Sequence, residues 1–145
     1  MATIPKHLRD GEDRSPGIAV LAELRPALLD LHKALLDWER SGYERAHGRQ
    51  SSGELLRLLL GHEQFHWLHT LSQLVVRIDQ EMEQDPPATA AEMKTLVETI
   101  RSTVAMRDMV SAFGQRYQAA LQDSPDAVMA HQRVSSIFRH RLTIP

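Results

Sequence analysis

The sequence predicts an all-α protein, an antiparallel bundle of four to five helices built on one long helical hairpin. Two observations predict this fold class. Apolar residues recur at intervals of three and four along most of the chain, which is the period of an amphipathic helix. The chain also contains no asparagine, so the Asn-Gly turns that are typical of β-hairpins are missing.

Composition limits the possible classes of protein. The chain has 145 residues, of which 42% are hydrophobic, which suits one domain with its own core. The absence of cysteine excludes disulfides, thiolate metal sites and cysteine nucleophiles. A net charge of -2 argues against a nucleic-acid binder, and no apolar run is long enough to cross a membrane. Because the first residues also lack the apolar stretch of a signal peptide, we expect a cytoplasmic protein.

The first helix follows a polar segment. Residues 1–17 carry prolines, glycines and mixed charge, so we expect a flexible arm there and a single helical domain over residues 18–145. The apolar spacing then predicts a helix over residues 25–47, with Gly48 as its terminator. Pro26 either starts this helix or kinks a longer one that begins near Ile18.

The second helix has a clear start signal. Ser51 and Glu54 form a capping box, and no proline follows until Pro86. We therefore expect one continuous helix of roughly 30 residues, antiparallel to the first. Its predicted buried side comprises Leu60, Leu71, Val75, Ile78 and Met82.

The remaining helices are shorter. Thr89 and Glu92 form a second capping box, which opens a third helix. The apolar phase is lost near residue 107, where we expect a break, and a helical stripe then resumes. Ser124 and Pro125 are an N-cap and a first-turn proline, and they open the last helix.

Several segments resemble a family of small uncharacterised bacterial all-helical proteins. The resemblance rests on residues 31–36, 43–49 and 113–128, and above all on WLHTLSQLVVRID at residues 67–79. It covers about residues 20–140 and implies a helical fold. It implies no activity, because the function of that family is not established. The family usually has an Asp-Pro-rich segment where this chain has His62 and His66.

Three of the eight histidines share one stripe of the second predicted helix. His62, His66 and His69 are spaced i, i+4, i+7, and the hairpin brings His32 level with His66 and His69. Imidazoles one turn apart can share a transition-metal ion, and haem is a further possible ligand. Helix phase, however, points the stripe away from the buried side. Solvated or packed histidines without a ligand are therefore the favoured interpretation.

Two Glu-x-x-His pairs raise the possibility of a di-iron site. They are Glu44 with His47 and Glu63 with His66, as in ferritin-like bundles. The hairpin places them about two turns or more apart, so we do not expect them to share one centre.

Aromatic and charged clusters have ordinary explanations. We expect core packing rather than a small-molecule pocket for Trp38, Trp67, Phe65 and Tyr43. We expect solvated or helix-end charges at the acidic residues Asp79, Glu81, Glu83 and Asp85 and at the basic residues Arg133, Arg139 and Arg141.

The start of the second helix is apolar nearly all round. Leu55, Leu58 and Leu59 lie on the histidine side, and Phe65 follows them. Such a helix is either central in its own bundle or covered by a second subunit. The leading hypothesis is a non-enzymatic bundle that acts through protein–protein contacts, including self-association, with no cofactor, nucleic acid or membrane. The alternative is a metal- or haem-binding bundle. No phosphate loop, nucleophile elbow or His-Glu-x-x-His motif favours an enzyme.

Overall fold

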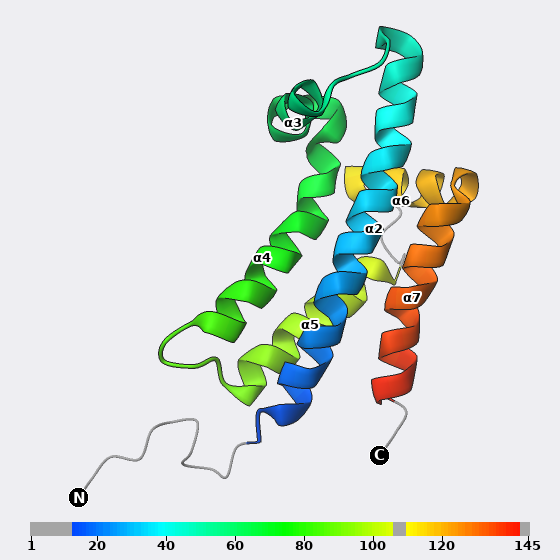
Figure 1. Ribbon diagram of the computed structural model, residues 1–145. Helices are drawn as coiled ribbons and strands as arrows, with labels where there is room; N and C mark the ends of the chain where they lie inside the picture. The colour runs from blue at the N-terminus through cyan, green and yellow to red at the C-terminus, as the bar shows by residue number, and fades with distance from the viewer. Residues whose placement is uncertain (1–12, 106–109, 143–145) are drawn as a thin grey trace, which may run out of the picture.

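The computed structural model describes residues 13–105 and 110–142 of the chain. Within these residues lie six α-helices, one 3-10 helix and no strand, which confirms the all-α class (Figure 1). In chain order they are α2 (Ser15–His47), α3 (Ser52–Gly61), η1 (Glu63–Leu68), α4 (His69–Glu83), α5 (Ala90–Val104), α6 (Ala112–Asp123) and α7 (Pro125–Leu142). The helices outnumber the predicted four to five because the second predicted helix is divided.

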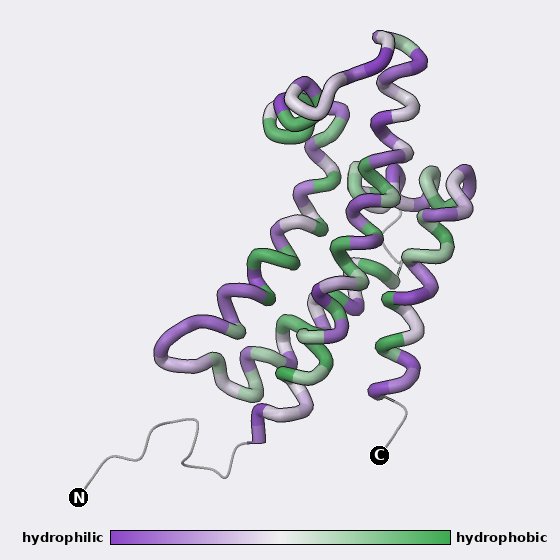
Figure 2. Tube along the Cα trace, viewed as in Figure 1, coloured by the Kyte–Doolittle hydropathy of each residue, from purple (hydrophilic) through white to green (hydrophobic). Residues whose placement is uncertain are grey.

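Helix α2 is the centre of the bundle. It contacts η1, α4, α5, α6 and α7, and in Figure 1 it stands between α4 and α7. Figure 2 shows hydrophobic and hydrophilic residues mixed along the long helices, as expected for helices with one buried face. The predicted stripe of α2 forms the middle of the core, where Leu24, Leu28, Leu31 and Leu35 are fully buried.

Helix α2 begins at Ser15, ten residues before the predicted start and inside the predicted arm. Val20 and Leu21 are buried and fix this first part of the helix on the core. Pro26 lies inside the helix without ending it. Pro26 and Ala22 are both exposed, so water can bond the Ala22 carbonyl that Pro26 cannot pair with. Residues 1–12 of the predicted arm lie outside the described residues.

The second predicted helix is not continuous. Helix α3 ends at Gly61, and His62 has an extended backbone (φ -86°, ψ 133°) before η1 and α4 follow. At 100° per residue, the leucines of α3 and the buried residues of α4 would point in nearly opposite directions on one straight helix. The break allows both sets to face the same core. Leu60 and Met82, which we expected to be buried, are exposed.

The helix starts agree with the cap signals. The hydroxyls of Ser51, Thr89 and Ser124 each accept a backbone N–H of the following helix, at 3.1–3.2 Å. The predicted break near residue 107 falls in residues 106–109, outside the described residues. Helix α5 ends before them at Val104 and α6 begins after them at Ala112. No helix in the described ranges is both long and apolar enough to cross a membrane.

Candidate functional site

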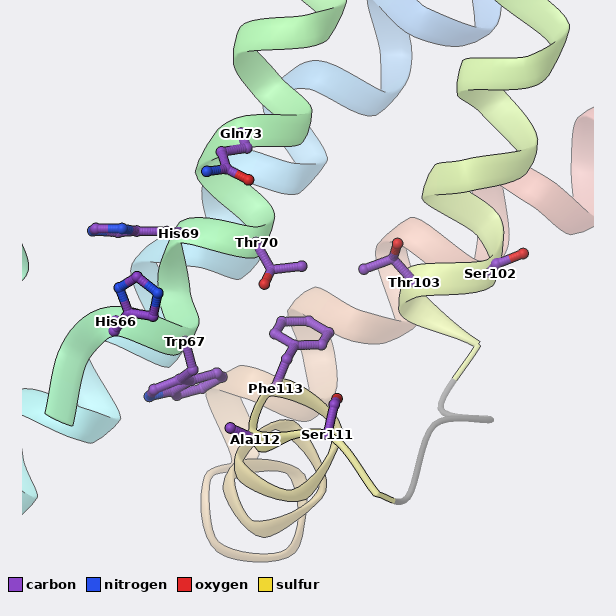
Figure 3. Close-up of a pocket in the computed structure, with 10 residues that line it drawn as sticks. All are labelled: His66, Trp67, His69, Thr70, Gln73, Ser102, Thr103, Ser111, Ala112 and Phe113. Atoms are coloured by element: carbon purple, nitrogen blue, oxygen red, sulfur yellow. The ribbon is translucent and has the colours of Figure 1, made fainter. Parts of the chain in front are cut away.

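A groove lies between the start of α4, the end of α5 and the start of α6. Its volume of about 570 Å³ is within the range of small-molecule sites. Figure 3 shows the ten lining residues: His66, Trp67, His69, Thr70, Gln73, Ser102, Thr103, Ser111, Ala112 and Phe113.

The side chains that line the groove are mainly hydrogen-bonding groups and aromatic rings. Its lining combines two imidazoles, four hydroxyls and one amide, and no Asp, Glu, Lys or Arg is among the described residues that line it. The rings of Trp67 and Phe113 lie 6.0 Å apart between centres. No carboxylate pair for acid–base chemistry is therefore present in this lining.

Behind the groove, a buried carboxylate joins three elements. Glu39 of α2 is only 2% exposed. Its oxygens accept hydrogen bonds from Trp67 Nε1 at 2.8 Å and from the Arg116 guanidinium at 2.7 and 2.9 Å. Gln64 adds a longer hydrogen bond of 3.3 Å. These bonds tie η1 and α6 to α2 and fix the side chain of Trp67 in the groove.

The two tryptophans pack around this carboxylate. Trp38 and Trp67 meet edge to face with ring centres 6.4 Å apart, and the Arg116 guanidinium carbon lies 4.7 Å from the Trp38 ring centre. Trp38 also donates to Asp123 at 2.7 Å. Of the predicted aromatic cluster, only Trp67 lines the groove, while Phe65 is fully buried against Tyr43.

The four predicted histidine ligands do not converge. Among the described residues, no three His, Asp or Glu side chains are placed to hold one metal ion. The physical reason is the break at His62, since the i, i+4, i+7 spacing places side chains on one face only in a continuous helix. Instead, the His62 ring caps η1, with Nδ1 accepting from the Gln64 N–H at 3.1 Å.

Of the other three predicted ligands, His66 and His69 lie near each other. The rings of His66 and His69 have centres 5.0 Å apart. His32 lies on α2, where burial and the nearby His69 lower its pKa, and its buried Nε2 has no hydrogen-bond partner in the described structure. The level of His32 with His66 and His69 across the hairpin stays a prediction.

Three of the four predicted interaction residues are on the inner side of α3. Leu55, Leu58 and Leu59 are half-buried against the core. Phe65 is fully buried, so it cannot meet a partner in this fold. The exposed leucines of α3 are Leu56 and Leu60, at 55% and 67%.

Ion pairs account for much of the predicted charged patches. Asp79 binds Arg25 at 2.6 Å, which lowers the pKa of the Asp79 carboxyl, and Arg141 binds Glu23 at 2.7 Å. Arg133 pairs with Asp30. These ion pairs connect α4 and α7 with α2.

Glu39 and Arg116 were not predicted from the sequence. The signal for Glu39 was present, because it follows Leu31 and Leu35 at four-residue spacing and so continues the buried stripe of α2. A charged residue on such a stripe requires a buried partner. Arg116 carries no equivalent signal.

Comparisons of the chain with protein-family models, with curated proteins and with solved structures found no match. The resemblance to the bacterial helical family therefore stays a prediction.

Proposed function

We propose that this protein is a non-enzymatic helical bundle that acts through protein–protein contacts, with a second copy of itself as the partner. The observation that carries the proposal is the exposed face of α3. Leu56 and Leu60 lie one turn apart on it and are exposed, whereas the other leucines of the same helix are half-buried.

The shape and charge of α3 suit a symmetric contact. Gly53, Leu56 and Leu60 follow a 3-4 spacing, which is a seam for helix packing. A Cβ atom built at Gly53 or at Gly61 meets no atom within 4 Å, so another backbone can approach closely there. The helix carries one acid, Glu54, and one base, Arg57, so two copies meet without net repulsion.

The energy of this contact is small. Full burial of a leucine contributes about 1.5–3 kcal/mol, and these leucines are already partly covered, so about 1–2 kcal/mol each is reasonable. A two-fold contact counts both leucines twice, for a total of about 4–8 kcal/mol. Association costs about 4–15 kcal/mol, so we expect a weak dimer that forms only at high concentration.

A role without catalysis fits the chemistry of the chain. No catalytic motif occurs in the sequence, and the described residues that line the groove include no Asp, Glu, Lys or Arg. A net charge of -2 gives no support for a nucleic-acid partner. The proposal includes a cytoplasmic location, in keeping with a chain without cysteine.

The test replaces Leu56 and Leu60 together by Glu. The wild-type chain should show a mass that rises from monomer toward dimer in sedimentation velocity between micromolar and millimolar concentration. The double variant should remain monomeric with unchanged helical circular dichroism.

The matched control is Met129→Glu, since Met129 is 69% exposed but lies on α7. This variant should associate like the wild type. A wild-type chain that stays monomeric at millimolar concentration would overturn the proposal, as would equal loss of association in the control.

A further inference from the structure

We propose that His66 and His69 of a single chain form a two-histidine site for a first-row transition-metal ion, with water completing the coordination. This site uses two protein ligands in place of the four-histidine cluster that the structure does not form. It does not depend on self-association.

The two imidazoles have the spacing that a shared ion needs. His66 is in the last turn of η1 and His69 is the first residue of α4, and both side chains extend from the same side of this helix start (Figure 3). An ion about 2.0–2.1 Å from each ligating nitrogen lies roughly 3 Å from each ring centre, so neighbouring ligands have centres roughly 4.5–5 Å apart. The observed separation is 5.0 Å, with the rings inclined by 59°.

A backbone carbonyl fixes the tautomer of His69. Its Nε2 lies 2.8 Å from the Leu59 carbonyl oxygen, which can only accept a hydrogen bond. Nε2 therefore carries the hydrogen, and Nδ1 keeps a lone pair for an ion. Histidine ligands of metal ions in proteins commonly donate their second nitrogen to a carbonyl in this way.

His66 is free to rotate toward the same ion. It is exposed, and its ring makes no hydrogen bond with any described residue. Binding at this position therefore breaks no existing bond of the fold.

Imidazole nitrogen determines which ions are suitable. It favours Zn²⁺, Ni²⁺ and Cu²⁺, whereas Mg²⁺ and Ca²⁺ prefer oxygen ligands. Calorimetric titration of the untagged full chain with NiCl₂ or ZnCl₂ should show one ion per chain, and MgCl₂ should give no binding heat.

His66→Gln is the decisive variant because it removes a ligand and no hydrogen bond. Loss of partners that only orient a ligand costs about 10–100-fold in affinity, so loss of the ligand itself should cost at least about tenfold. His140→Gln, at an exposed histidine on α7, is the matched control and should bind like the wild type. In nuclear magnetic resonance spectra, Zn²⁺ should shift the imidazole signals of His66 and His69.

Equal affinity of His66→Gln and the wild type would overturn the site, as would loss of binding in His140→Gln. The Leu56→Glu/Leu60→Glu variant separates this inference from the proposed function. It should bind Ni²⁺ with wild-type affinity as a monomer. A loss of binding in that variant would show that the ion bridges two copies and that the single-chain site is wrong.

Discussion

Glu39 is a buried charged residue that depends on its hydrogen-bond partners. Its carboxylate is 2% exposed and receives the guanidinium of Arg116, a side chain that is itself 43% exposed. A buried ion pair is weak evidence of net stability, but removing one partner leaves the other buried and uncompensated.

Arg116→Met should therefore destabilise the protein. Removing one partner of a fully buried pair costs about 3–5 kcal/mol, and because Arg116 is partly solvated we expect about 2–3 kcal/mol. Urea denaturation measures this free energy of unfolding. Lys33→Met is the control, since the Lys33–Asp37 pair is exposed and should cost less than about 0.5 kcal/mol. Equal costs for the two variants would contradict the assigned role of Glu39.

His131 makes stability depend on pH. Burial lowers its pKa from the ordinary value of 6.5, and its Nδ1 lies 2.7 Å from the Tyr117 hydroxyl oxygen. The unfolded chain thus binds a proton more readily than the folded chain. This contribution to stability is complete above about pH 6.5 and is lost as the pH falls through the lowered pKa.

His131→Gln should reduce this dependence. The free energy of unfolding of the wild type should fall between about pH 7.5 and about pH 5, and the variant should fall by less. Part of the slope remains, because burial also lowers the pKa of His32. A variant at position 131 with the full wild-type slope would rule out the assignment.

At the scale of elements, the close contact between α2 and α5 depends on the absence of a side chain at Gly17. A Cβ atom at this position would lie 2.9 Å from the Met93 Cβ, which is closer than real contacts allow. The two helices can approach at this point only because residue 17 has no side chain.

Gly17→Ala and Gly53→Ala should therefore have opposite effects. Alanine gains up to about 1 kcal/mol over glycine inside a helix, and Gly53 has open space around it. At Gly17 overpacking costs about 1–3 kcal/mol, so we expect a net loss of about 1 kcal/mol. Thermal unfolding of both variants measures the difference. A gain at position 17 equal to that at position 53 would refute the close contact.

At the scale of the whole molecule, local signals predicted most of the helices. The 3-4 spacing identified the buried stripe of α2, and cap residues such as Thr89 and Ser124 marked helix starts correctly. Each of these features depends on residues that lie close together in the sequence, so a single sequence is enough to predict it.

The division of the second helix was missed for a physical reason. The sequence places the leucines of α3 opposite the buried residues of α4, and a second subunit or a break can satisfy that pattern equally well. In the structure the helix is broken, and the break follows Gly61, since glycine is a poor helix former. The predicted histidine stripe and the predicted interaction surface both assumed a straight helix. Because the helix is broken, neither set of side chains shares one face as predicted.

Of the buried ion pair behind the groove, only one residue could be predicted from the sequence. Glu39 is recognisable from its place on the stripe of α2, but its partner Arg116 is 77 residues away. Which side chain reaches a buried carboxylate depends on how α6 packs on α2. That depends on the whole fold rather than on any local pattern.

Helix α3 is packed less tightly than the other helices of the molecule. None of its residues is fully buried, so it can open at a lower free energy than the bundle beneath it. A partner that covers Leu56 and Leu60 binds only the closed form and thereby stabilises it. Association through this helix and its local folding are then one coupled equilibrium, in which each event makes the other more favourable.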